Sequence, residues 1–300
     1  MRASTAKEAN SSDRASVSDR SRWRERYARS GERDALFTSI SGRAARRIWA
    51  RELRDTYAAK SEKSLLMRTH AQTAGVSLTA QQPLNNITRT AIEGLAAVLG
   101  GTQSLHTNSH DEALALPTED AVRTALRTQQ VIAEETGVTN TIDPLAGSYF
   151  VEHLTDRMEQ AAYDYFAKID ELGGMVEAVK ANYPQREIAD ASFTYQGEVD
   201  SGRRIVVGVN GYTEGDEGTI ETLRIDAALE RKQMDRLKGV RSRRDSAAVE
   251  QTLADLRDAA AGERNLMYPL IECACAHASE GEIVASLQQV FGDYTESPVF

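Results

Sequence analysis

The fold of this chain is decided by residues 63–117, which read KSLLMRTHAQTAGVSLTAQQPLNNITRTAIEGLAAVLGGTQSLHTNSHDEALALP. Two short apolar runs in this stretch, 64–67 and 102–107, each lead into a polar cluster, and a helical segment lies between them. A strand with a polar end, a helix, and a second strand with a polar end form the order of a parallel β/α unit. In such units chemistry gathers at the carboxyl ends of the strands. We therefore look for a functional site in the two polar clusters.

The first cluster follows the apolar run 64–67 and contains Arg68, His70 and Gln72. Residues two apart on a strand point to the same face, so these three side chains are expected to lie together. A guanidinium beside an imidazole suits a carboxylate, a thioester carbonyl or a phosphate. The alternative is structural: Arg68 pairs with a carboxylate of the fold, and His70 is a hydrogen-bonded core histidine.

The second cluster follows the second expected strand. Alternation along that strand places Gln103 on one face and His106 and Asn108 on the other. His106 and Asn108 also have a structural interpretation as caps. Asp111 and Glu112 precede an expected helix, where acidic side chains commonly do no more than complement the helix dipole.

The rest of the chain reads mainly as helices. Apolar spacing and caps predict helices at 43–58, 84–99, 118–135, 150–172, 175–181 and 184–199, and a helical region at 227–290. Further strands are predicted at 139–142 and 203–210, a brief extended piece at 37–42, and a linker at 213–218.

Charge is unevenly distributed in this chain of 300 residues with net charge −9. Residues 1–60 hold 15 Lys and Arg against 8 Asp and Glu, and the remainder is strongly acidic. We interpret the basic head first as a solvated arm, with an anionic partner as the alternative. The acidic body argues against nucleic acid as the main ligand.

No targeting or membrane signal is expected from the sequence. No apolar run approaches the roughly 18 residues that span a membrane, and the first residues lack the apolar core of a secretory signal. Their Arg and Ser content faintly resembles a transit peptide, but the acidic residues among them argue against one. We predict a cytoplasmic protein.

Cysteine and histidine spacings predict no metal site. Cys273 and Cys275 lie two apart in a helical run, where their side chains diverge, so we expect neither a disulfide nor a shared metal but two buried small side chains. His106 and His110 could be mistaken for a metal pair, but the spacing falls across a loop without a third ligand.

Three longer runs carry a family resemblance. They are RTHAQTAG (68–75), LTAQQPLNNITRTAIEGLAAVLGGTQSLHTNSHDEALALPT (78–118) and DPLAGSYFVE (143–152). They resemble the large, catalytic chain of the adenosylcobalamin-dependent acyl-CoA mutases, the family of methylmalonyl-CoA mutase. The resemblance is dense from about 43 to 210 and looser to 294.

The resemblance implies a partial α/β fold. The chain would form the C-terminal part of a (β/α)8 TIM barrel, about three β/α units, followed by a mainly helical C-terminal segment. The expected divisions are a polar, partly disordered arm at 1–42, the partial barrel at 43–210 and a helical region at 211–300.

The resemblance also implies a reaction. Family members rearrange the carbon skeleton of an acyl-CoA, as from (R)-methylmalonyl-CoA to succinyl-CoA, with adenosylcobalamin as the radical source. We expect a subunit of such an isomerase, incomplete and inactive alone, with a cobalamin-binding subunit and a mutase subunit as partners. Alternatives are a mutase for isobutyryl-CoA or ethylmalonyl-CoA, and a non-catalytic fragment that binds a mutase complex.

Site residues are carried over position by position. The substrate-binding set that the resemblance implies is His70, Gln103, Arg68 and Asn108. The cofactor-binding set is Gln72, Glu112 and Ala113. No catalytic residue is assigned, because the family's radical-cage Tyr, Arg and His lie on earlier barrel strands without a counterpart here. The Asp-x-His-x-x-Gly signature of the cobalamin-binding domain is also missing from this sequence.

Overall fold

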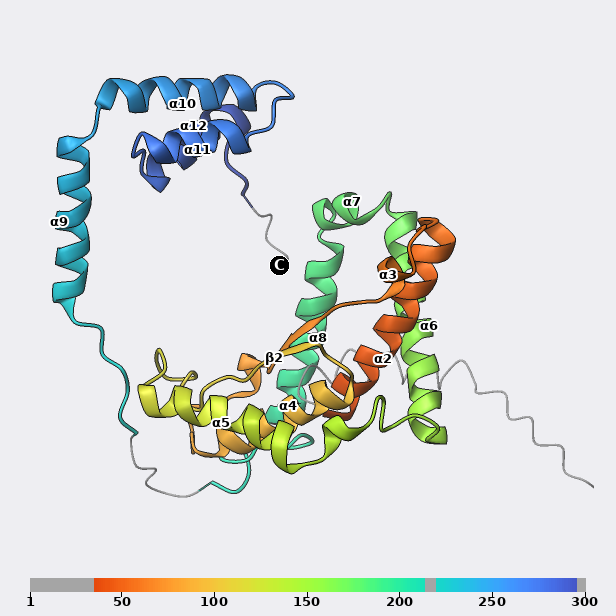
Figure 1. Ribbon diagram of the computed structural model, residues 1–300. Helices are drawn as coiled ribbons and strands as arrows, with labels where there is room; N and C mark the ends of the chain where they lie inside the picture. The colour runs from red at the N-terminus through yellow and green to blue at the C-terminus, as the bar shows by residue number, and fades with distance from the viewer. Residues whose placement is uncertain (1–34, 214–219, 296–300) are drawn as a thin grey trace, which may run out of the picture. The chain divides into compact units, whose positions relative to one another are not determined.

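A computed structural model of the chain describes residues 35–213 and 220–295. These residues fall into two compact units whose boundary lies between Leu223 and Arg224 (Figure 1). The polar arm up to residue 34 and nearly all of the predicted linker 213–218 lie outside the described residues.

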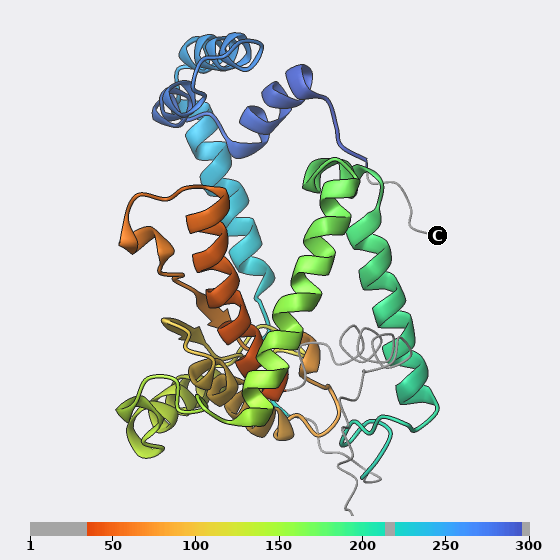
Figure 2. The same cartoon turned by 90° about the vertical axis from the view of Figure 1, so that its right-hand side faces the viewer.

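The first unit is mostly helical. Its α-helices and strands are α2 (Ala35–Arg51), α3 (Glu62–Leu65), β1 (His70–Gln72), α4 (Asn85–Leu99), β2 (Ser104–His106), α5 (Glu119–Glu135), α6 (Tyr149–Glu171), α7 (Met175–Lys180) and α8 (Tyr183–Asp200), and a π-helical turn at Glu52–Thr56 continues α2. The helices predicted from 84 to 199 are confirmed to within a residue or two. Figure 2 shows α6 and α8 as long helices joined at one end by α7, and the Tyr165 hydroxyl donates to Glu187 between them at 2.9 Å.

The sheet of this unit has two parallel strands in the described part of the chain. Helix α4 connects β1 to β2, and His70 pairs with Ser104 and Gln72 with His106. α4 packs against β2 and against α5, and Gly94 lets it approach closely: a Cβ there would lie 3.2 Å from Ile132 and 3.4 Å from Thr107. An α/β arrangement around a parallel sheet is therefore confirmed.

Two of the predicted strands are misplaced or absent. Residues 64 and 65 end the short helix α3, 66 and 67 lie in the segment after it, and the strand begins later, at His70, where it lies beside β2. The predicted strand at 139–142 is wrong, since Val138–Asn140 form a 3-10 turn after Gly137, whose φ is +69°. With no neighbouring strand described there, this backbone has no ladder to join.

The strand predicted at 203–210 is also wrong. This segment turns back on itself, with a single bridge between Val207 and Gly211. The Asn210 side chain takes up the backbone groups that a strand would use: it accepts from Val206 N–H and donates to the carbonyls of Val199 and Arg204, each at 2.7 Å. One amide side chain thus replaces a sheet ladder.

The extended piece predicted at 37–42 is helical, because it forms the first turns of α2. Ile40 is fully buried in the core with Ala44, Val151, Leu154 and Met158. Where α2 crosses α4, the Ser39 hydroxyl donates to the Ala96 carbonyl at 2.8 Å. Tertiary packing therefore overrides the local preference of the Thr-Ser-Ile-Ser run.

A row of arginines ties α2 to α6. Arg43, Arg47 and Arg51 recur every four residues along α2, and their partners on α6 are Glu152, Thr155, Asp156 and Glu159. Arg43 also reaches Asp143 in the loop before α6 at 3.2 Å. These ion pairs and hydrogen bonds hold α2 to α6 beside the apolar core that the two helices share.

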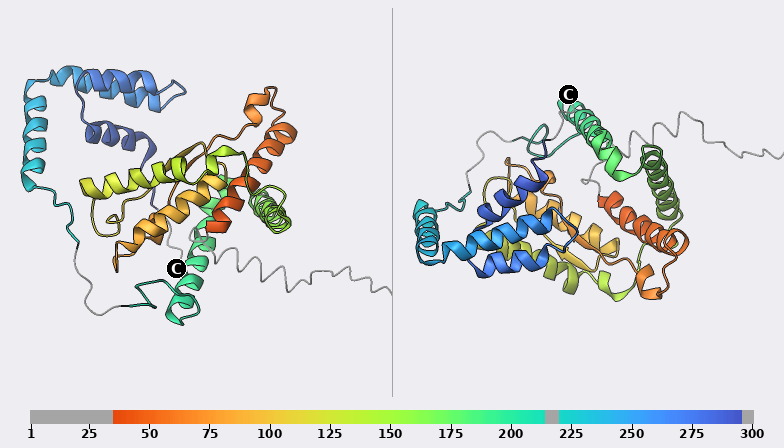
Figure 3. Two further views of the ribbon diagram at one scale, coloured as in Figure 1. Left: turned by 60° about the horizontal axis from the view of Figure 1, so that its bottom comes forward. Right: turned by 90° about the horizontal axis from the view of Figure 1, so that it is seen from above.

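The second unit consists of α9 (Ala227–Arg243), α10 (Ser246–Ala260), α11 (Met267–Cys275) and α12 (Glu280–Phe291). The helical region predicted at 227–290 is thereby confirmed. α10 packs against α11 and α12 (Figure 3), with Leu256 and Cys273 fully buried. The prediction of two buried cysteines is wrong for Cys275, which is exposed.

A charged pair fixes the start of α12. Arg244 donates to both carboxylate oxygens of Glu282, at 2.5 and 2.7 Å, and Glu282 also accepts from the Ser279 N–H and hydroxyl in a capping box. The hydrogen bond from Arg244 holds the pKa of Glu282 well below its usual value. This carboxylate therefore stabilises the unit only while it is ionised.

We expect Glu282→Gln to lower the free energy of unfolding by about 1 kcal/mol at pH 7. Because the folded pKa is depressed, the stabilisation is complete above the unfolded pKa of about 4.3 and is lost as the pH falls through the folded pKa. Thermal unfolding of the whole chain at pH 7, 5 and 3 measures the difference. Exposed Glu280 of the same helical turn is the control, and an equal effect of Glu280→Gln would contradict the role of Arg244.

Candidate functional site

The two polar clusters predicted from the sequence meet on one face of the small sheet. His70, Gln72, Ser104 and His106 are exposed, whereas Ala71 and Leu105 between them are partly buried. Parallel pairing in register sets the four polar side chains in two rows. The alternation predicted for His70 and Gln72 is confirmed, and the result is an exposed polar face. We call these four residues the sheet face.

His70 is oriented on the sheet face by its strand neighbour. Its Nδ1 lies 2.5 Å from the Ser104 hydroxyl oxygen, so a hydrogen bond links the two strands. Since Nδ1 is engaged, the other ring nitrogen, Nε2, is the one left for a ligand. The interpretation of His70 as a core histidine is wrong, because the side chain is exposed.

Asn108 lies beneath the sheet face rather than on it. It is 3% exposed, and its side-chain oxygen accepts from the Thr73 hydroxyl at 3.0 Å and from the Gln72 amide at 3.4 Å. Its backbone N–H donates to the same Thr73 hydroxyl at 2.9 Å. Asn108 therefore joins the ends of the two strands and steadies Gln72.

Gln103 fastens the start of the sheet. Its side-chain oxygen accepts from the Thr69 N–H at 2.7 Å, and its amide donates to the Gly101 carbonyl at 2.8 Å. Both polar ends are thus engaged with backbone, which sets the register of β1 against β2. Arg68 precedes β1, is exposed, and makes no hydrogen bond or ion pair with any described residue.

Glu112 and Ala113 lie in the turn that follows β2, and both are exposed. The buried residue of this turn is Asp111, whose carboxylate accepts from the Thr118 N–H and hydroxyl at 2.8 and 3.0 Å. The prediction that Asp111 merely serves the helix dipole is too simple, because the Thr118 hydroxyl in turn caps α5 at Ala121 N–H.

The sequence interpretation missed a polar stripe on the buried face of α4. Asn86, Thr90 and Glu93 are buried, and Glu93 accepts from the Ala74 N–H at 2.9 Å. Asn86 donates to the carbonyls of Thr79 and His110, both at 2.9 Å. The signal was visible as polar residues at helical spacing on the side that an amphipathic helix buries.

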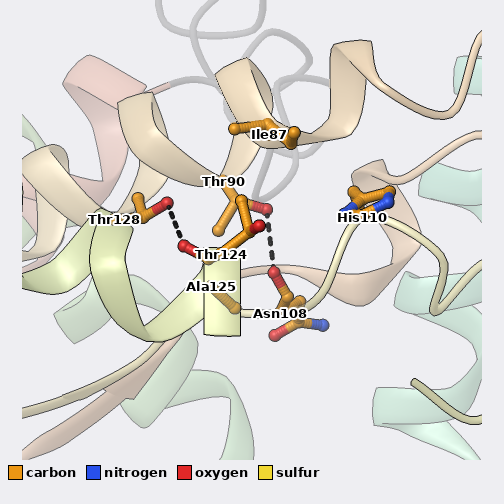
Figure 4. A pocket seen from close by; sticks show the side chains of 7 residues that line it. All are labelled: Ile87, Thr90, Asn108, His110, Thr124, Ala125 and Thr128. Carbon is orange, nitrogen blue, oxygen red and sulfur yellow. Dashed lines mark hydrogen bonds between the residues drawn. The ribbon is translucent and has the colours of Figure 1, made fainter. Parts of the chain in front are cut away.

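A small hollow lies under the strand ends between α4 and α5. It is lined by Ile87, Thr90, Asn108, His110, Thr124, Ala125 and Thr128 (Figure 4). The hydroxyls of Thr90 and Thr128 donate to backbone carbonyls, those of Asn108 and Thr124. Its empty volume of about 160 Å³ is below the several hundred Å³ of typical ligand pockets.

Comparison with known proteins places the chain in a family. The profile of the family described as methylmalonyl-CoA mutase matches residues 33–293, which is most of the sequence. The chain belongs to the methylmalonyl-CoA mutase family. The resemblance of the three sequence runs is thereby confirmed.

Curated relatives agree with this membership in the mutase family. A methylmalonyl-CoA mutase of Rhizobium meliloti is 47% identical over 258 residues, covering 85% of this chain and 36% of the relative. The mitochondrial methylmalonyl-CoA mutase of Mus musculus is 45% identical, covering 84% and 34%. The methylmalonyl-CoA mutase of Escherichia coli is 46% identical, covering 86% and 36%. This mutase-family chain spans about a third of the length of these relatives.

The described residues contain neither a membrane-spanning helix nor a cluster of metal-binding side chains. None of the helices in the described ranges is long and apolar enough to cross a membrane. Within the same ranges, no three His, Cys, Asp or Glu side chains are grouped so that they could hold a metal ion.

Proposed function

We propose that this mutase-family chain supplies one wall of the acyl-CoA and corrin pocket of a methylmalonyl-CoA mutase-like isomerase. The observation that carries the proposal is the parallel pairing of β1 with β2, which gathers His70 and Gln72 with Ser104 and His106 on one open face. The turn carrying Glu112 follows the same strand end. The family membership supports the reaction class.

In this proposal the sheet face binds the acyl-CoA. His70 Nε2 is free to donate to, or accept from, a thioester or carboxylate group, since Ser104 holds Nδ1. Arg68, exposed beside the start of β1, offers a cation for a carboxylate or phosphate. Gln103 and Asn108, expected as substrate contacts, act here by holding register and by steadying Gln72.

The residues present fit one edge of a cobalamin. Ala113, Leu114 and Leu116 form an exposed apolar surface beside the Glu112 carboxylate, which suits a macrocycle with amide side chains. Gln72 offers an amide from the neighbouring strand end. Adenosylcobalamin, when bound, supplies the radical that starts the rearrangement. The residues of this chain then bind and orient.

We further propose that residues 43–210 are the C-terminal part of a TIM barrel, with the helical region 211–300 after it. The polar arm predicted at 1–42 would end at 34, because residues 35–42 belong to α2. Helix α4 connecting two parallel strands is the repeating unit of such a barrel, which supports this assignment. The barrel's other strands, a cobalamin-binding subunit and a mutase subunit would then be the partners of this chain. A cytoplasmic location stays a prediction, and relatives from Mus musculus and Homo sapiens are named mitochondrial.

Binding of methylmalonyl-CoA to the whole chain tests the proposal. We expect isothermal titration calorimetry to detect binding and His70→Ala to weaken it about tenfold, the effect of losing one charge-assisted hydrogen bond. Exposed His153 on α6 is the matched control, and His153→Ala should leave the affinity unchanged. Absence of binding, or an equal loss in both variants, would contradict the proposal.

Turnover separates the alternatives. We expect no succinyl-CoA from the chain alone, because no radical-cage residue is assigned to it. Co-purification with a mutase subunit, without turnover and without acyl-CoA binding, would instead support a non-catalytic subunit-binding role. Conversion of isobutyryl-CoA or ethylmalonyl-CoA in a reconstituted complex, but not of methylmalonyl-CoA, would select one of the related substrates.

A further inference from the structure

The turn between β2 and α5 has an exposed tip on a buried base. Glu112, Ala113, Leu114 and Leu116 are exposed, whereas Asp111 beside them is 1% exposed. Because the Asp111 side chain is buried directly below an exposed turn, it can fix the shape of the turn. We call residues 112–116 the tip.

Asp111 closes the turn on itself. Its Oδ2 accepts from both the N–H and the hydroxyl of Thr118, at 2.8 and 3.0 Å, and its carbonyl accepts from the N–H groups of Leu114 and Ala115, at 2.8 and 3.1 Å. One residue therefore holds the middle and the end of the turn. A shift of Asp111 would move the whole tip.

The base of the turn is fastened to α4 as well. Asn86, fully buried, donates to the His110 carbonyl at 2.9 Å, directly before Asp111. On the strand side, Thr90 donates to the Asn108 carbonyl at 3.4 Å (Figure 4). The residues just before the turn are thus bonded to helix α4, and Asp111 in the turn is bonded to Thr118 at the start of α5.

The charge of Asp111 is not matched by a cation in the described structure. Its Oδ2 makes the two bonds to Thr118, while its Oδ1 is buried without a hydrogen-bond partner among the described residues. A neutral amide of the same shape could keep the Oδ2 bonds and place its NH2 group where Oδ1 lies. The shape and the acceptor, rather than the charge, are therefore what the turn requires.

We infer that Asp111 is a positioning residue that presents the tip to the cobalamin. This inference rests on the proposed function for the identity of the ligand, and on the geometry alone for the fixing of the turn. This role of Asp111 differs from stabilising the dipole of α5. Glu119 and Asp120 in the first turn of α5, together with the Thr118 cap, already do that.

Hydrogen exchange and cofactor binding of the whole chain test the inference together. We expect Asp111→Ala to speed the exchange of the Leu114 and Ala115 amides about tenfold and to weaken adenosylcobalamin binding by a similar factor, measured by equilibrium dialysis. Asp111→Asn should stay within about twofold of the unaltered chain in both measurements, since the acceptor is kept.

A control variant separates positioning from general destabilisation. Thr155→Ala removes a buried hydroxyl that receives the Arg43 hydrogen bond on α6, away from the turn. It should lower the thermal midpoint without changing exchange at the tip or cofactor affinity. If it weakens cofactor binding as much as Asp111→Ala does, the positioning role is overturned.

The remaining outcomes decide between the inference and the proposed function. Unchanged exchange at the tip in Asp111→Ala would overturn the inference, as would faster exchange with undiminished adenosylcobalamin binding. If the unaltered chain binds no adenosylcobalamin while Asp111→Ala still speeds exchange, the cofactor part of the proposed function fails. The role of Asp111 in fixing the turn then stands.

Discussion

Arg43→Ala is expected to lower the free energy of unfolding of the first unit by about 2–3 kcal/mol. Arg43 is 7% exposed and is the centre of three contacts, with Glu152 at 2.6 Å, Thr155 at 3.0 Å and Asp143 at 3.2 Å. Removing it leaves three acceptors without their donor at the α2–α6 contact. The partial exposure of both carboxylates lets water satisfy them in part, which keeps the loss at or just below the lower end of the range of about 3–5 kcal/mol for buried ion pairs.

The electrostatics of the contact between α2 and α6 also indicate that removing Arg43 is destabilising. The hydrogen bond from Arg43 lowers the pKa of Glu152 below its usual value, so Glu152 is ionised throughout the neutral range. Asp143, the third partner, has a positive φ of 48°, a conformation that Asp tolerates better than most residues. Arg43 thus also holds the backbone of the loop before α6 in an uncommon shape.

Urea unfolding followed by tryptophan fluorescence, to which Trp49 on α2 contributes, measures the loss. Arg47→Ala is the matched control: it lies one turn further along the same helix, but its side chain is 37% exposed, and we expect less than about 1 kcal/mol. Arg43→Lys keeps the positive charge but lacks the planar guanidinium that bonds several acceptors at once. It should therefore recover less than half of the stability lost in Arg43→Ala. A loss from Arg47→Ala as large as that from Arg43→Ala would show that burial is not what matters.

Helices with a clear apolar stripe and a clear cap were predictable from the sequence. The Thr118 cap and the acidic pair after it place the start of α5, and the structure shows the Thr118 hydroxyl accepting from Ala121 N–H. α4 ends at Leu99, before Gly100 and Gly101, with φ +81° at Gly101. Such signals are local, so they need no knowledge of the rest of the fold.

The strands were less predictable because a strand is defined by its partner. Leu65, Leu66 and Met67 are apolar enough for a strand, yet β1 begins only at His70, where Ser104 lies opposite. Gln103 sets that register by accepting from the Thr69 N–H. Nothing within residues 64–72 could show that a side chain 34 positions later fixes where the strand starts.

The candidate site was predictable in its residue types and less so in its roles. His70 and Gln72 were correctly placed on one face by alternation, and the parallel pairing adds Ser104 and His106. The supporting residues escaped notice because their partners are backbone groups of distant loops: Glu93 with Ala74 N–H, and Asn86 with the His110 carbonyl. Long-range hydrogen bonds of this kind leave no periodic pattern in a sequence.

The contacts divide these polar residues into two groups. The residues of the sheet face have polar atoms that are available to a ligand. The polar side-chain atoms of the second group form hydrogen bonds with strand ends and turns; this group is Asn108, Asn86, Glu93 and Asp111. Of this buried group, Asn108 bonds a residue of the sheet face, Gln72, and the other three bond the segments that follow the two strands. Because three-residue strands supply few ladder hydrogen bonds, side chains must supply the remaining order.

Gly42→Ala is expected to destabilise the first unit by about 3 kcal/mol, although alanine favours a helix over glycine by about 1 kcal/mol. A Cβ at Gly42 would lie 2.6 Å from the carbonyl oxygen of Gly100 and 3.3 Å from its carbonyl carbon, so backbone must move. The two helices cannot separate freely, since the Ser39 hydroxyl bonds the Ala96 carbonyl of α4 at 2.8 Å.

The sign of the effect is what makes this substitution informative, and Gly197→Ala provides the control. Gly197 lies within α8, and a Cβ there would meet nothing within 4 Å, so alanine should stabilise the chain by about 0.5–1 kcal/mol. Urea unfolding of both variants gives opposite signs if α2 and α4 cross as described. A gain in stability from Gly42→Ala would mean that the two helices do not touch at Gly100, and the placement of α2 across the end of α4 would then be wrong.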